Sequence, residues 1–141
     1  MRDLVTKTRD SKPQVTLSFA LECDPEAPRR ARRVVSGLEA VLPPPIIHDL
    51  GVVVTELVSN AVRFGPPAPI GVAVDVQADG GVRGAVADGG VGTEILDRGR
   101  DLGDGGLGLL IVDALCTRWG AEHRPNRVWF ELEAADPGPL S

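Results

Sequence analysis

Two alternating apolar segments joined by a tight turn constrain the fold of this chain most. Apolar side chains occupy every second position from Ile70 to Val76, and a second strand-like segment runs from Val82 to Ala87. Between them stands Asp79-Gly80-Gly81, a strong turn signal. A period of two is typical of half-buried strands. We therefore predict an antiparallel hairpin at the centre of the chain.

The remaining pattern places helices before and after this hairpin. Residues 15–21 alternate like a strand, and Asp24 with Pro25 is typical of a helix start, as N-cap and first-turn proline. Apolar residues then recur at helical spacing. The predicted elements are a strand over 15–21, helices over 24–42, 46–64 and 107–117, and strands over 118–123 and 127–132. This order predicts an α+β two-layer sandwich, with a mixed, mostly antiparallel sheet and helices on one face.

The length of 141 residues is that of one domain. We expect the folded domain to span residues 14–133, with a flexible arm over 1–13 and a flexible Pro- and Gly-rich tail over 134–141. Residues 1–13 lack the apolar centre of a signal peptide, and no apolar run reaches the ~18 residues that cross a bilayer. A cytoplasmic protein without membrane contact is expected.

Charge and metal-ligating residues exclude several classes of function. The net charge of −5 argues against direct nucleic-acid binding, which needs a basic surface. The arginines within 29–33 are interpreted as a solvated helix face. Cys23 and Cys116 fit no metal or redox motif and are expected to be reduced, buried thiols. His48 and His123 stand apart from other ligand residues, so no zinc site is predicted.

Three motifs carry polar groups suited to a nucleotide. Glu56 and Asn60 are four residues apart and project from one side of the predicted second helix. A carboxylate there can accept a proton, and an amide oxygen can ligate Mg²⁺. Asp88, at the end of a strand and before glycines, can accept a hydrogen bond from an amine. The segment Gly103–Leu109 leads into a helix, whose N-terminus suits phosphate.

Each motif alone also has a structural reading. The Glu-Asn pair fits a solvent-facing helix surface, the aspartate fits a simple turn, and the last glycine segment fits a flexible hinge. Taken together, their order and spacing resemble the GHKL ATPase superfamily, the Bergerat fold. Residues 56–61 resemble its E-x-x-x-N-A box, residues 88–92 its D-x-G-x-G box, and residues 106–109 its G-x-G-L box.

The resemblance implies ATP and Mg²⁺ as cofactors and a role for each matching position. Glu56 would be the catalytic base, Asn60 would hold Mg²⁺, and Asp88 would bind the adenine amine. The glycine and leucine positions would shape the adenine side of the pocket or close the lid over the phosphates; they are Gly90, Gly92, Gly106, Gly108 and Leu109. Residues 93–105 would be that lid, and Arg98 and Arg100 within it have no role fixed by a motif.

Three segments, residues 108–115, 118–120 and 128–132, further resemble the stand-alone anti-sigma-factor serine kinases of actinobacterial type. This implies a serine/threonine protein kinase that phosphorylates a small anti-sigma-factor antagonist and sequesters a sigma factor. Relatives of this kind often dimerise, which leaves a homodimer open. A non-catalytic module that binds ATP or only a partner is the alternative. The detached ATPase module of a histidine kinase is disfavoured, because the first helix has no phosphoacceptor histidine.

Two features depart from the family pattern. A histidine often follows the N-A-x-x spacing, where this chain has Phe64. The expected lid also carries Asp97, Asp101 and Asp104, which repel phosphate unless Mg²⁺ or arginine offsets them. Both departures bear on turnover more than on binding.

Overall fold

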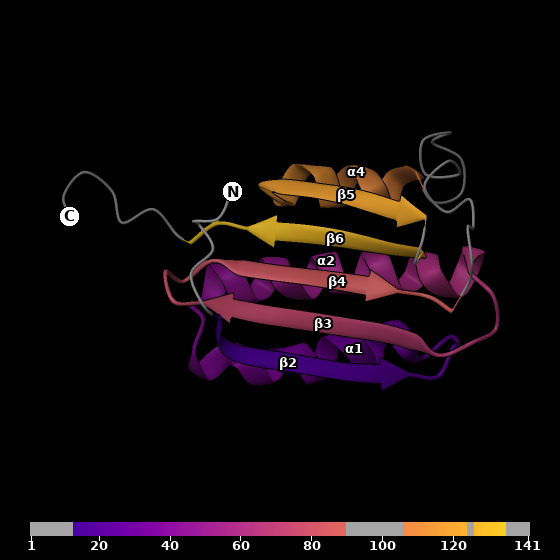
Figure 1. The fold of residues 1–141 in the computed structure, drawn as a ribbon, viewed down its shortest axis with the longest axis horizontal. Coiled ribbons are helices and arrows are strands. Elements are labelled where there is room, and N and C mark those ends of the chain that lie inside the picture. Colours follow the sequence, from indigo (N-terminus) through magenta and orange to yellow (C-terminus); the bar gives the residue numbers. More distant parts are fainter. Residues whose placement is uncertain (1–12, 90–105, 124–125, 135–141) are drawn as a thin grey trace.

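A single open sheet covered by helices on one face forms the domain (Figure 1). The computed structural model describes residues 13–89, 106–123 and 126–134. The elements in chain order are β2 (Pro13–Leu21), α1 (Ala27–Val35), the 3₁₀ helix η2 (Ser36–Ala40), α2 (Pro44–Phe64), β3 (Ile70–Gln77), β4 (Val82–Ala87), α4 (Gly106–Leu115), β5 (Arg118–His123) and β6 (Asn126–Leu132). The predicted α+β two-layer sandwich is confirmed.

The sheet has the strand order β2-β3-β4-β6-β5, and the four pairings among the described strands are all antiparallel. The predicted hairpin is formed by β3 and β4, with Val76 opposite Val82. The turn between β3 and β4 needs a residue with positive φ. Gly80 has a φ of 92° there, which glycine adopts readily because it has no Cβ atom. β4 pairs with β6 rather than with β5, and this crossover places the last strand of the chain inside the sheet, between β4 and the edge strand β5.

α2 is the central helix of the covering layer. Its buried side chains face the sheet, and among them Leu50, Val53 and Val54 are completely enclosed. The helix is long and apolar enough to cross a membrane by length and composition, yet 44% of its most apolar window is buried inside this fold. A core helix meets the same criterion, so the apolar content of α2 is explained by the sheet beneath it. Helices α1 and α4 flank α2 (Figure 1).

Helix starts differ from the sequence expectation. α1 begins at Ala27, not at Asp24, and Asp24 instead accepts the Glu26 backbone N–H at 2.9 Å and pairs with Arg30. The helix expected over 46–64 begins two residues earlier, because Pro44 and Pro45 form the first turn of α2. Proline suits a helix N-terminus because its missing N–H would have no partner there. The segment between the two helices is η2 rather than further α-helix.

Two strand glycines make room for aromatic rings from β6. A Cβ atom on Gly84 would overlap the ring of Phe130, its partner in the β4–β6 ladder, on the side that faces the helices. A Cβ atom on Gly120 would lie 2.8 Å from the indole of Trp129 on the opposite face. The indole of Trp119 donates to Asp113 at 2.9 Å and fastens the end of α4 to β5.

Candidate nucleotide site

One end of the sandwich gathers the predicted polar residues. α2 ends there, β4 ends beside it, and β6 and α4 begin there (right side of Figure 1). Antiparallel neighbours place the end of one strand next to the start of the other. The same end of the sandwich therefore holds the helix with the E-x-x-x-N-A box, the aspartate after β4 and the glycine-rich start of α4.

Asn60 and Glu56 occupy successive turns of α2 with different exposure. Asn60 is buried, with 4% of its surface exposed, and Glu56 is half-buried. A buried amide needs hydrogen-bonding partners, whereas a half-exposed carboxylate remains accessible to solvent. Asn60 thus points into the domain, and Glu56 lies where a second molecule can reach it.

Asp88 is a buried carboxylate, 8% exposed, that follows the last residue of β4. The Nδ2 group of Asn126 donates to both of its oxygens, at 2.7 Å to Oδ1 and 2.6 Å to Oδ2. Asn126 is 5% exposed and begins β6. Hydrogen bonds to an ionised acceptor are short and strong, and their strength rises where water is excluded.

A small cavity joins residues of two predicted motifs. Its volume is about 20 Å³, and its lining residues are Leu57, Asn60, Ala61, Val86, Asp88, Ala121, Glu122, Asn126, Arg127 and Val128. The structure thus brings Asn60 and Asp88 together although 27 residues separate them in the chain. That volume holds about one water molecule. A purine base needs these walls to move apart.

An ion pair borders the cavity. Arg127 Nε lies 3.1 Å from Glu122 Oε1, and both side chains are about two-fifths exposed. Partly exposed pairs of this kind contribute about 0–1 kcal/mol to stability, because water screens them. The pair can therefore open without a large cost.

The glycine-rich boxes are only partly described. Gly106 and Gly108 lie in the first turn of α4, as the G-x-G-L resemblance requires for a helix N-terminus. Leu109 follows them and is buried in the core. Gly90 and Gly92 lie outside the described residues, as do the expected lid over 93–105 and its two arginines.

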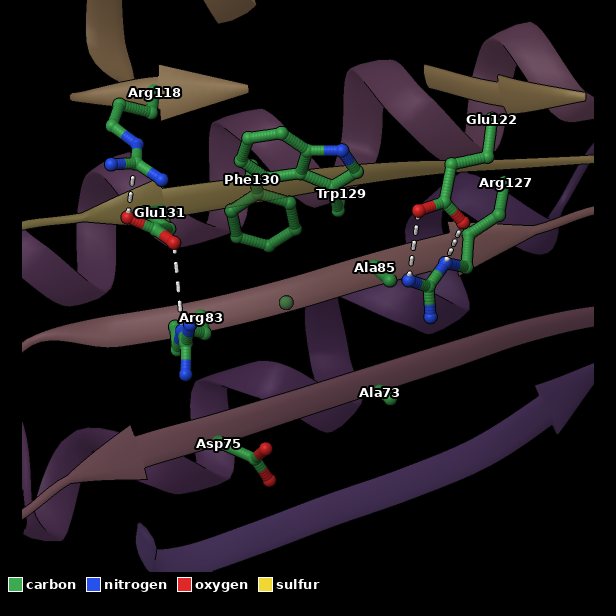
Figure 2. A pocket seen from close by; sticks show the side chains of 11 residues that line it. Ala73, Asp75, Arg83, Ala85, Arg118, Glu122, Arg127, Trp129, Phe130 and Glu131 are labelled. Atoms are coloured by element: carbon green, nitrogen blue, oxygen red, sulfur yellow. Dashed lines mark hydrogen bonds and ion pairs between the residues drawn. The ribbon is translucent and has the colours of Figure 1, made fainter. Parts of the chain in front are cut away.

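A larger hollow of about 420 Å³ lies on the uncovered face of the sheet (Figure 2). The carboxylate of Glu131 forms ion pairs there with Arg83 and Arg118, and each arginine Nε lies 3.5 Å from a carboxylate oxygen. None of the predicted site residues lines this hollow. Its basic groups already have acidic partners, and it is shallow, so the small cavity beside Asp88 is the better candidate despite its size.

Two residues of the site escaped the sequence analysis. Asn126 lies one residue before the expected strand 127–132 and had no motif. Gly65 directly follows the helix expected over 46–64 and was given no role, but a Cβ atom there would lie 2.7 Å from Asp88 Oδ2. No group of three His, Cys, Asp or Glu side chains within the described ranges could hold a metal by itself.

The described elements define an α+β sandwich, with an open antiparallel sheet and helices on one face. A family model described as the histidine kinase-like ATPase domain matches residues 21–138. The chain belongs to this family, which confirms the expected resemblance to the histidine kinase-like ATPases.

A solved structure agrees on the fold. The crystal structure of the RsbU and RsbW domains of Rv1364c from Mycobacterium tuberculosis superposes with a TM-score of 0.63 at 24% identity. The match covers 86% of this chain and 32% of that chain, so the present chain spans about a third of that structure's length. A search of curated proteins found no match.

Proposed function

We propose that this chain is a cytoplasmic ATP-binding regulatory protein, a serine/threonine protein kinase of the anti-sigma-factor type. The observation that carries the proposal is the shared cavity of Asn60 and Asp88, which come from two different family boxes. Membership of the ATPase family and the fold shared with a structure that contains an RsbW domain support it.

Each proposed role follows from the chemistry of the side chain. Asp88, as an acceptor-only carboxylate, would bind the exocyclic amine of adenine. Asn60 would supply one oxygen to Mg²⁺, which takes one or two protein ligands and completes its shell with phosphate and water oxygens. Gly106 and Gly108 would let the phosphates approach the free N–H groups at the start of α4. Gly90 and Gly92 are assigned to the adenine side by resemblance only.

ATP would supply the transferable phosphoryl group, and the hydroxyl of a protein serine or threonine would receive it. Glu56 would accept the hydroxyl proton as ADP departs. The proposed acceptor is an anti-sigma-factor antagonist, and the proposed second partner is a sigma factor. A homodimer is part of the same proposal.

The small volume of the cavity favours one competing function. A protein that binds only a partner protein, and no nucleotide, needs no cavity large enough for a purine base. A non-catalytic binding module is therefore the second candidate. Phe64, where relatives often have histidine, is compatible with it. Nucleotide titration separates the two functions.

The test is calorimetric titration of the purified chain with ATP, with and without Mg²⁺, for the wild type and Asp88→Ala. The matched control is Asp75→Ala, which removes an aspartate of β3 outside the cavity. We expect binding that strengthens with Mg²⁺, disappears in Asp88→Ala and persists in the control. Asp88→Ala removes the carboxylate that accepts from the Asn126 amide. An unsatisfied buried donor costs about 1–3 kcal/mol of stability, so circular dichroism must show that the variant is folded. A folded wild type that binds no ATP would support the non-catalytic module instead.

A further inference from the structure

The face of the sheet opposite the helices carries a row of four charges with alternating sign. Asp75 lies opposite Arg83 in the β3–β4 ladder, and Arg83 lies opposite Glu131 in the β4–β6 ladder. Glu131 in turn lies opposite Arg118 on β5. In the order of the strands, the charges are negative, positive, negative and positive (Figure 2). We call these four residues the charged row. None of the described helices covers it (Figure 1).

The next row on the same face has no charge and combines small side chains with one large one. Ala73 and Ala85 are partners in the β3–β4 ladder, and Trp129 lies between Ala85 and Gly120. The indole of Trp129 lies over Gly120, where a Cβ atom would be 2.8 Å from the ring. Ala73, Ala85 and Trp129 all line the hollow of about 420 Å³. The surface is therefore raised over β6 and β5 and lower over β3 and β4.

The charged row is complementary to itself. Read in the opposite direction, a row of four alternating charges has the opposite sign at every position. A two-fold axis that runs parallel to the strands, between β4 and β6, brings a second copy face to face and reverses the order of its strands. Asp75 then faces Arg118 of the second copy, and Arg83 faces Glu131 of the second copy. Every charge of the row thus meets a charge of opposite sign across the interface.

The same axis also matches the raised and the lower parts of the face. It sets Trp129 over Ala85 of the second copy and Gly120 over Ala73, so each indole enters the lower part of the other copy. Sheets that pack face to face keep their strands within about 30° of each other, which an axis parallel to the strands allows. An axis along the row would instead stack the two Trp129 rings on each other and hold the alanines apart. The shape therefore favours the axis that the charges favour.

We propose that this sheet face, with the charged row and Trp129, is the interface of a two-fold homodimer of the chain. The proposal names the surface for the homodimer of the proposed function, and it rests on that part of the function. Burial of the two indoles supplies the affinity, as tryptophan often does at the centre of an interface. The charged row selects the orientation, because Glu131 already has Arg83 and Arg118 beside it and a further pairing adds little affinity.

Sedimentation equilibrium of the full-length chain measures the dissociation constant of the dimer. The charge variants are Asp75→Arg and Arg118→Asp, which change the two ends of the charged row, and Trp129→Ala removes the indole. The control is Thr16→Arg. Thr16 is exposed and lies opposite Asp75 on β2, which the proposed axis leaves outside the overlap of the two copies. Circular dichroism checks that each variant is folded.

We expect the wild type to dimerise and Thr16→Arg to match it. Asp75→Arg, Arg118→Asp and Trp129→Ala should each weaken the dimer by at least about ten-fold. Each charge variant sets two pairs of like charges against each other in its own dimer. An equimolar mixture of Asp75→Arg with Arg118→Asp should dimerise again, because every facing pair in the mixed dimer is of opposite sign. Damage confined to the single chains would not be repaired by mixing.

Three results would overturn the inference. Charge variants that dimerise like the wild type would place the interface on another surface. A mixture that stays monomeric would mean that Asp75 does not face Arg118 of the second copy. Both results would leave the homodimer of the proposed function intact. A wild type that is monomeric at every concentration would overturn the inference and the homodimer together, whereas the titration with ATP tests nucleotide binding separately.

Discussion

A Cβ atom on Gly65 would lie 2.7 Å from Oδ2 of Asp88, which is too close for a carbon and an oxygen atom without a shift of one of them. The same Cβ atom would lie 2.7 Å from the carbonyl oxygen of Ala61. Gly65 has a φ of −88°, which any residue adopts, so the requirement for glycine here is space and not backbone conformation. The end of α2 is therefore fitted to the Asp88 carboxylate.

Gly65→Ala is expected to weaken ATP binding by about ten-fold, because the carboxylate must turn away or α2 must shift. Calorimetric titration measures the affinity. The control is Gly71→Ala on β3, where a Cβ atom would meet nothing within 4 Å. An unchanged affinity for Gly65→Ala, in a protein whose binding needs Asp88, would show that the carboxylate tolerates displacement.

Gly84→Ala is expected to destabilise the domain by about 1–3 kcal/mol, as overpacking of a filled core does. The added methyl group would press on the Phe130 ring, whose Cε1 atom would lie 2.7 Å away. Phe130 is fully buried and has little freedom to move. Urea denaturation measures the change, again beside Gly71→Ala. A midpoint equal to that of the wild type would mean that the ring can repack at no cost.

The hairpin was predictable because its signals are local. A period of two that is broken by Asp79-Gly80-Gly81 indicates two strands and a turn between them. It gives the start of β3 at Ile70, both limits of β4 and the place of the turn, where Gly80 has a positive φ. The helix boundaries were less predictable. Proline can end one helix or begin the next. The three prolines at 43–45 therefore do not indicate by themselves whether they follow the first helix or belong to the first turn of the second.

The contact between Asp88 and Asn126 could not be predicted from sequence. β4 and β6 are neighbours in the sheet, but α4 and β5 lie between them in the chain. No local pattern specifies such a pairing or its register. The family boxes indicated Asn60 and Asp88, and the structure brings both to one cavity. Their roles, with those of Glu56 and the glycines, stay predictions.

Glu56→Gln should retain ATP affinity within about two-fold and lower phosphoryl transfer by about 10²–10⁴-fold, the usual contribution of a general base. Glu56 does not line the buried cavity and is half-exposed on α2, as a group that meets an incoming hydroxyl should be. Transfer of labelled phosphate to a candidate antagonist protein measures the rate. Glu39→Gln, at an exposed position on η2, serves as the control. Equal transfer by Glu56→Gln would remove this residue from the mechanism.

The thiol of Cys116 is expected to be unreactive in the native protein at neutral and mildly alkaline pH. Burial, and then the negative charges of Asp113 and Asp49, raise its pKa from 9.0 to about 12. The thiolate is the reactive species. In a Cys23→Ser background, alkylation by iodoacetamide at pH 8, followed by mass spectrometry, should be at least ten-fold slower for the native protein than in denaturant. Similar rates in both states would contradict the raised pKa.

The same shift predicts how this thiol affects stability at high pH. The folded state holds the proton more tightly than the unfolded state, so the contribution is fully present below pH 9 and is lost as the pH rises toward 12. Cys116→Ala should therefore flatten part of the decline in stability above pH 9. The chain has no tyrosine, which removes one competing titration in this range. Urea denaturation at pH 8, 9.5 and 10.5 measures the slope, and Cys23→Ala controls for the loss of a thiol. An identical decline with and without Cys116 would show that its ionisation is not linked to unfolding.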